Sequence, residues 1–332
     1  MSLAIGRLAG VAILAVLLAT SCSSDQQKEQ GQAAQATPTA VATEIPASTP
    51  TPTPSPTPVP TPTPVPTSAP IDPPEPIPIE PPEGWELIWH DEFDGEEIDL
   101  TNWTYDIGGW GWGNGEAQYY TSRPENSRVE NGLLVIEARQ EKFEGSYFTS
   151  ARMLTKGHRE FKYGRFEARL KVPAGAGLWP AFWMLGAHFD RHSENPANHW
   201  PFVGEIDIME YIGREPDLIF GTLHGPGYAG AIGFTKWNRQ DYDIADDFHT
   251  YAIEWDEEGI SWFYDGEHYN TLTRDVVGNR EWVFDHEFFL ILNLAVGGHF
   301  PGPIGLDVEF PVNLYVDYVR VYQPIAETVS EA

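Results

Sequence analysis

The chain has 332 residues, of which 49 are acidic and 20 are basic, giving a formal net charge of −29. An excess of negative charge of this size disfavours nucleic acid and anionic membrane surfaces as partners, because both repel it. Sulfated and uronic polysaccharides are disfavoured more weakly, so a neutral partner fits best.

Residues 1–21 have the pattern of a signal peptide. Arg7 supplies a basic start, and the apolar run Leu8–Ala19 is too short to span a bilayer. Cys22, the only cysteine, ends the sequence ATSC, which resembles a bacterial lipoprotein cleavage site. We therefore expect an exported protein anchored through a lipid on Cys22, at the bacterial cell surface or outer membrane. Ordinary cleavage and secretion is the alternative.

Residues 22–82 are predicted to be a linker rich in proline and threonine. The stretch Pro50–Pro70 reads PTPTPSPTPVPTPTPVPTSAP. Proline removes backbone donors, and few of these residues are apolar enough to form a core, so we expect a disordered spacer. At about 3 Å per residue, it would hold a folded domain roughly 100 Å from an anchor.

Residues 83–325 have the size of one all-β domain and the pattern of strands and turns. Residues 133–138 and 163–172 alternate between apolar and polar side chains, as half-buried strands do. Residues 251–255 and 260–264 alternate likewise and flank the turn sequence DEEG, which predicts a hairpin.

The last part of this region contains two further predicted strands. Residues 288–296 are nearly all apolar, as a strand buried on both faces would be, and residues 316–322 alternate again. Because few windows show the helical period, we predict a sandwich of two antiparallel sheets. Residues 326–332 are expected to be a C-terminal tail.

Three carboxylates lie within six residues of the run GEIDIMEYIG, residues 204–213. Glu205 and Asp207 share one face of a strand, whereas the odd offset of Glu210 from Glu205 would point it to the other face. A β-bulge of one extra residue would return Glu210 to the same face. Carboxylates crowded in this way repel each other, which raises at least one pKa.

Such a cluster suits chemistry that needs one charged and one protonated carboxylate. Two are sufficient for glycoside hydrolysis, in which one attacks the anomeric carbon and the other protonates the leaving oxygen. A metal site or a solvated acidic edge is the alternative. The apolar residues between the carboxylates favour a packed strand, because a hard-cation site prefers a loop. They are Ile206, Ile208 and Met209.

Ordered motifs surround this run over nearly all of residues 84–323. They are WGNGEAQYYT (112–121), VENG (129–132), SARMLTKG (150–157), FKYGRFEARLKVPAGAGLWPAFWMLG (161–186), GTLHGPGY (221–228), DDFHTYAIEW (246–255), FFLILNLAVGG (288–298) and VDYVRVYQ (316–323). With them, the sequence resembles the laminarinase branch of family 16 of the glycoside hydrolases. The resemblance implies a β-jelly-roll sandwich of two antiparallel sheets with a concave substrate cleft, and retaining endo-hydrolysis of β-1,3-glucan.

The resemblance also implies roles for the three carboxylates. Glu205 corresponds to the nucleophile, Glu210 to the acid/base and Asp207 to an assisting carboxylate. The form of the motif that includes Met209 is the one that laminarinases carry, whereas mixed-linkage lichenases lack that residue.

A glucan site needs flat aromatic platforms with polar groups around them, because sugar rings have apolar faces and polar rims. Trp179 and Trp183 are four residues apart, an even offset that permits one shared face. The resemblance implies that both are platforms on the donor side, with core packing as the alternative. It places three further residues along that side, namely Asn114, Glu116 and Arg152. For both Arg152 and Glu116, a structural salt bridge is the alternative.

His224, in the sequence HGPG, resembles a histidine near the leaving-group side. It is expected to bind substrate or to modulate Glu210, and a purely structural role is the alternative. Phe300 stands where relatives commonly carry tryptophan, and it lacks the indole donor.

A structural calcium ion is also implied by the resemblance, on the convex side and away from catalysis. The matching residues are Glu92, Gly132 and Asp317. Glycine is no objection, because calcium accepts backbone carbonyls as well as carboxylates. In the alternative reading, Asp317 only accepts a hydrogen bond.

Other activities stay open on the same fold. They are transglycosylation, hydrolysis of mixed-linkage β-1,3-1,4-glucan, cleavage of agar or carrageenan, and glucan binding without catalysis. A binding protein would be marked by loss of a catalytic glutamate, and both are present here. We expect a monomer with no catalytic cofactor.

Overall fold

The computed structural model describes residues 71–72 and 74–325. The predicted signal peptide, the lipidation site Cys22, most of the linker and the C-terminal tail lie outside the described residues. In the part that is described, no helix is long and apolar enough to cross a membrane.

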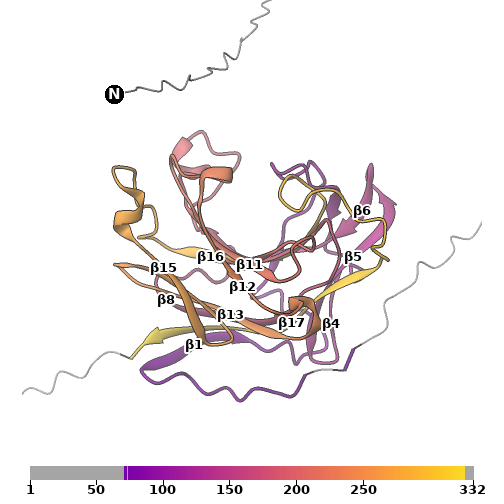
Figure 1. Ribbon diagram of the computed structural model, residues 1–332, viewed down its shortest axis with the longest axis horizontal. Coiled ribbons are helices and arrows are strands. Elements are labelled where there is room, and N and C mark those ends of the chain that lie inside the picture. Colours follow the sequence, from indigo (N-terminus) through magenta and orange to yellow (C-terminus); the bar gives the residue numbers. More distant parts are fainter. Residues whose placement is uncertain (1–70, 73, 326–332) are drawn as a thin grey trace, which may run out of the picture. The chain divides into compact units, whose positions relative to one another are not determined.

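Two β-sheets are stacked and curve in the same direction (Figure 1). The inner sheet consists, from edge to edge, of β12 (Phe234–Arg239), β11 (Leu218–His224), β10 (Glu205–Tyr211), β9 (Leu178–Gly186), β16 (Phe288–Val296), β7 (Arg152–Leu154) and β2 (Thr104–Tyr105). All neighbours in this sheet are antiparallel.

The outer sheet has ten strands. In order they are β15 (Glu267–Thr273), β14 (Gly259–Tyr264), β13 (His249–Trp255), β8 (Gly164–Lys171), β17 (Val312–Pro324), β5 (Leu133–Phe143), β6 (Ser146–Ser150) and β3 (Gln118–Tyr120), with β1 (Trp85–Asp91) on β17 and β4 (Ser127–Glu130) on β5. Strands β3 and β6 are parallel. The helices of the described chain are single 3₁₀ turns: η1 (Pro196–Asn198), η2 (Gly230–Ile232), η3 (Ile244–Asp246) and η4 (Arg274–Val277).

The strands expected from the sequence are all present, and the two-sheet prediction is confirmed. In β8 the side chains of Phe166, Ala168 and Leu170 are buried, whereas Glu167 and Arg169 between them are half-buried. The predicted hairpin joins β13 to β14 across the DEEG turn. This agreement follows from the two-residue period of a strand, which the sequence shows directly.

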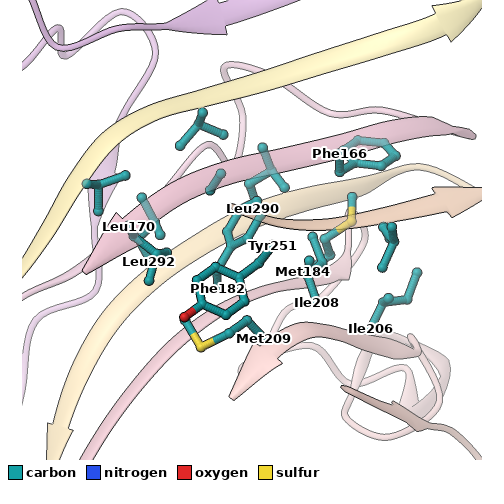
Figure 2. Packing of buried hydrophobic residues seen from close by; sticks show 14 of the residues in the cluster. Phe166, Leu170, Phe182, Met184, Ile206, Ile208, Met209, Tyr251, Leu290 and Leu292 are labelled. Carbon is teal, nitrogen blue, oxygen red and sulfur yellow. The ribbon is translucent and has the colours of Figure 1, made fainter. Parts of the chain in front are cut away.

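Every residue of β16 is buried, because the strand is covered on both faces. Leu290 and Leu292 belong to the main core between the sheets, and Figure 2 shows them among side chains from β8, β9, β10 and β13. Phe289 and Ile291, on the opposite face, belong to a second, smaller cluster with Val203.

The predicted β-bulge is present in β10. Asp207 pairs with Thr222 of β11, but the next pair is Glu210 with Phe220, so Ile208 and Met209 together face one residue of β11. That residue is Gly221, the only one between Thr222 and Phe220. Ile206, Ile208 and Met209 all point into the core (Figure 2). The bulge therefore leaves Glu205, Asp207 and Glu210 together on the opposite face.

A tryptophan of the outer sheet supports the bulge from across the core. A bulge disrupts the local ladder of backbone hydrogen bonds, and a buried carbonyl without a partner is costly. The fully buried Trp262 of β14 donates its indole Nε1–H to the backbone oxygen of Asp207, at 2.9 Å. Gly221 provides the room, because a Cβ there would lie 2.5 Å from Trp262 Nε1.

Residues 71–72 and 74–82 have no regular secondary structure, and some of them contact the outer sheet. Arg169 of β8 donates to the backbone oxygen of Glu75 at 3.2 Å, and Arg320 of β17 donates to that of Ile77 at 2.9 Å. In Figure 1 this indigo segment runs along the outer side of the sandwich. The last part of the predicted linker thus lies against the folded domain.

Candidate active site

The candidate site is the outward face of the inner sheet around β10, which we call the carboxylate face. The antiparallel register places His224 of β11 opposite Glu205. On the other side, Trp183 of β9 is opposite Asp207. Directly opposite residues of neighbouring strands point to the same face. The sheet therefore gathers side chains from three strands around the carboxylates.

Glu210 is held by two donors on this face. Trp179 of β9 donates its indole Nε1–H to Glu210 Oε1 at 3.1 Å, and the Thr222 hydroxyl of β11 donates to Oε2 at 3.3 Å. Because each carboxylate oxygen has its own partner, the orientation of the group is fixed.

His224 lies against the other two carboxylates. Its Nε2 is 3.5 Å from Glu205 Oε1 and 3.3 Å from Asp207 Oδ2. The imidazole thus sits between these two side chains, where its charge when protonated would favour their ionised forms. The sequence predicted that this histidine binds substrate or modulates Glu210, and a protonated His224 would also lower the pKa of Glu210.

Burial makes all three carboxyl groups hard to ionise. Removal from water, followed by the charge of Asp207, raises the pKa of Glu205 to about 8 and that of Glu210 to about 8. Burial also raises the pKa of Asp207 well above its usual range. Groups that share so small a space cannot all be charged, so ionisation of one carboxylate keeps a proton on its neighbour.

The same groups have the composition of a metal site. In the described chain, Glu205, Asp207 and His224 are the one group of three or more acidic, cysteine or histidine side chains whose ligand atoms lie within 4.8 Å of one another. Two features favour acid–base catalysis over metal binding. The apolar side chains of β10 pack into the core, and Glu210 accepts hydrogen bonds from Trp179 and Thr222.

Arg152 lies between two aromatic rings beside the carboxylates. Its guanidinium carbon is 4.7 Å from the ring centroid of Trp183 and 4.9 Å from that of Trp112. An ion pair with Asp106, at 3.0 Å, holds it in place. The structural salt bridge that the sequence left open for Arg152 is therefore present. Arg152 also lies next to Trp183, a predicted stacking platform for sugar.

Glu116 is buried and bound within the protein. Its oxygens accept hydrogen bonds from the side chains of Asn114 (3.1 Å), Gln118 (2.6 Å) and Tyr120 (3.1 Å). Asn293 donates to the Tyr120 hydroxyl at 3.2 Å. These bonds make Glu116 the anchor of the loop that carries Asn114.

The network continues to the second predicted platform. Asn293 of β16 accepts the indole Nε1–H of Trp183 at 2.7 Å. Trp179 and Trp183 therefore share the carboxylate face, as their spacing predicted, and each donates to a different partner. Since an indole has a single donor, these bonds fix the tilt of both rings.

The sequence did not predict one residue of this face, Thr222, and one residue of the supporting network, Tyr120. Thr222 is two residues before His224 on β11, so the strand period alone could have placed it beside the carboxylates. Tyr120 links Glu116 to Asn293, and no local pattern indicates the second contact, because Asn293 is 173 residues further along the chain.

The predicted calcium ligands lie together at the outer sheet. Strand β17 pairs with β5 as far as Val316 and with β1 from Val319 onward, so Asp317 lies where the strand changes partner. Glu92 directly follows β1, and Gly132 directly precedes β5. The register thus brings these residues to one place.

The two carboxylates of this group, Asp317 and Glu92, each accept a hydrogen bond from an arginine. Asp317 accepts from Arg169 at 2.8 Å, and Glu92 accepts from Arg320 at 2.7 Å. A calcium ion would therefore be held by the second oxygen of Asp317 and by backbone carbonyls, a donor set that calcium accepts.

We predict that Glu205→Gln stabilises the protein at neutral pH. A carboxyl group whose pKa rises from 4.5 to about 8 on folding binds its proton more tightly in the folded state. The free energy of unfolding therefore falls as the pH rises through this window, and the amide escapes that loss. We expect a gain of about 1 kcal/mol or more at pH 7, which disappears at pH 4.

Denaturant unfolding at pH 4, 7 and 9 measures this difference. Glu210→Gln should behave in the same way, because the pKa of Glu210 is raised to a similar value. A variant that is no more stable than the wild type at pH 7 would contradict the argument.

Comparison with known proteins identifies the family. The model for glycosyl hydrolases family 16 matches residues 114–297. A β-glucanase of Rhodothermus marinus is 49% identical over 248 residues, which cover 72% of this chain and 85% of that protein. The catalytic domain of an endo-1,3-β-glucanase (laminarinase) from Thermotoga petrophila superposes with a TM-score of 0.67 at 46% identity, covering 72% of this chain and 98% of that domain. An endo-β-1,3-glucanase from Pyrococcus furiosus gives 0.68 at 44% identity, covering 73% and 95%. The chain therefore belongs to the glycosyl hydrolases of family 16.

Proposed function

We propose that this protein is an endo-β-1,3-glucanase that hydrolyses laminarin-type glucan with retention of anomeric configuration. The observation that carries the proposal is the bulge of β10, which places Glu205, Asp207 and Glu210 on one face among indole and hydroxyl donors. Relatives described as β-glucanase and endo-1,3-β-glucanase supply the substrate class.

In the first step, the Glu205 carboxylate attacks the anomeric carbon and the Glu210 carboxyl protonates the departing glycosidic oxygen. His224 lies beside Glu205 and favours its charged form, which a nucleophile needs. With Glu205 ionised, a second charge nearby in the same buried site is unfavourable, so the proton stays on Glu210. In the second step, Glu210 takes a proton from a water molecule, whose oxygen bonds to the anomeric carbon and displaces the Glu205 carboxylate.

The substrate is held by stacking and by hydrogen bonds. Trp179 and Trp183 offer flat apolar faces on the carboxylate face, and Arg152 borders Trp183 with donors, while Asn114 belongs to the loop that Glu116 anchors. A neutral glucan matches a chain with a net charge of −29 better than an anionic polysaccharide does.

The first test compares the wild-type protein with Glu205→Gln on laminarin and on mixed-linkage β-1,3-1,4-glucan. We expect oligosaccharides from laminarin with the wild type alone, and a loss of at least about a thousandfold in the variant, because the nucleophile is removed. NMR of the first product gives the anomeric configuration. Inverted product, or an active variant, would overturn the mechanism.

Two other activities have distinct outcomes in the same experiment. Longer products at high oligosaccharide concentration would show transglycosylation, in which a sugar replaces water. Binding of laminarin without cleavage would show a glucan-binding protein, although Glu205 and Glu210 are both present and oriented.

We also propose a structural calcium ion held by Asp317 with the backbone of Glu92 and Gly132. The strand register that brings these residues together supports it. The ion would join the beginning and the end of a domain whose only cysteine, Cys22, lies outside it.

Chelation should therefore lower the melting temperature while changing activity at moderate temperature little. Asp317→Asn should remove most of this response, and Asp307→Asn, which alters an exposed aspartate, should keep it. A melting temperature that is the same with calcium and with chelator would count against the site.

We propose finally that the protein is exported and anchored by a lipid on Cys22. The support is the sequence alone: a short apolar run after Arg7, the ATSC sequence and a polar stretch behind it. In a bacterial host that grows with a labelled fatty acid, the wild type should take up label and Cys22→Ser should not. Equal labelling of both would exclude this anchor.

A further inference from the structure

The carboxylate face continues beyond β11 onto the edge strand β12. Thr222, which donates to Glu210, is also 3.2 Å from the hydroxyl of Thr235 on β12. Thr235 therefore points to the same face as Glu210. Trp237 is two residues further along β12, so its side chain points to this face as well.

Trp237 is the most exposed tryptophan of the described chain, with 62% of its surface accessible. Because this exposed ring lies on the same face as the carboxylates, it is available to a ligand bound there. An indole offers a flat apolar surface with a polar rim, and this suits the face of a neutral sugar ring.

Aromatic rings connect Trp237 with the carboxylates. Its cross-strand neighbour on β11 is Phe220, which is also opposite Glu210. The Phe220 ring centroid is 5.3 Å from that of Phe300, which is 5.4 Å from that of Trp179. Trp179 in turn donates to Glu210. This aromatic row runs from the catalytic group to the edge of the sheet.

The outer part of the row, Phe220 and Trp237, lies on the opposite side of β10 from Arg152 and Trp183. Arg152 and Trp183 are on β7 and β9, whereas Phe220 and Trp237 are on β11 and β12. Two strand spacings, about 10 Å, separate β12 from β10. One pyranose ring does not span this distance, so a sugar at Trp237 would be at least the second one beyond the bond that breaks.

We propose that Trp237 is a stacking platform for the leaving-group part of the glucan, at the second sugar or beyond. This inference rests on the proposed function and extends it, because endo-cleavage requires the polymer to be held on both sides of the scissile bond. The same platform would hold an acceptor sugar, which makes it a determinant of transglycosylation too.

The test compares two substrates of the full protein. Laminarihexaose extends on both sides of the site, whereas an aryl β-laminaribioside places sugars on the donor side only. Trp237→Ala should lower kcat/KM for laminarihexaose about fivefold to tenfold, the loss of one aromatic contact, and lower that for the aryl substrate less than twofold. Trp237→Phe should restore part of the loss, because it keeps an apolar face.

Tyr147→Ala is the matched control, since this aromatic residue of β6 is equally exposed (65%) and lies in the other sheet. It should leave both substrates unaffected. Equal losses on both substrates in Trp237→Ala would indicate a general structural role and would overturn the platform. No loss on laminarihexaose would overturn it as well.

Binding separates this inference from the proposed reaction. Calorimetry of laminarihexaose with Glu205→Gln requires no turnover, and adding Trp237→Ala should weaken binding by a similar factor. If the wild type cleaves neither substrate, the proposed hydrolysis fails, and this measurement decides the platform by itself. Equal affinity with and without Trp237 would then reject it.

Discussion

The bulge in β10 is the constraint on which the rest of the site depends. A regular strand with this spacing would point Glu210 into the core, where Ile206, Ile208 and Met209 lie instead. The core therefore selects the bulge, because burying a carboxylate among those side chains costs far more than a disrupted ladder. Apolar packing on the core side of β10 thus determines which carboxylates lie on the carboxylate face.

Two residues that are not candidates for substrate binding compensate for the disrupted ladder of backbone hydrogen bonds. Trp262 reaches across the core from the outer sheet to the carbonyl of Asp207, and the glycine at position 221 leaves space for its ring. This bond connects the two layers at the point where the catalytic strand is irregular. Errors in packing at Trp262 would therefore be transmitted to the carboxylates, although none of its atoms faces them.

The carboxylates around the bulge lower the free energy of unfolding when they ionise, and the same groups supply the reactivity of the site. Burial raises the pKa values of Glu205 and Glu210, so each group destabilises the fold when it is ionised. The surrounding groups offset part of this cost and also orient the carboxylates. Trp179 and Thr222 donate hydrogen bonds to Glu210, and His224 lies beside Glu205. Such perturbed groups are typical of functional sites.

The sequence by itself determined the strands, the two-sheet fold class, the bulge and the shared face of Trp179 and Trp183. All of these follow from local periods of apolar and polar residues and from the resemblance to a family. Only the tertiary structure decided which strands are neighbours. The contacts of Trp262 with the bulge and of Asn293 with Tyr120 join segments 55 and 173 residues apart, and the aromatic row joins three strands and one loop. Sheet pairing between distant segments depends on the whole core, so no local pattern could have assigned these partners.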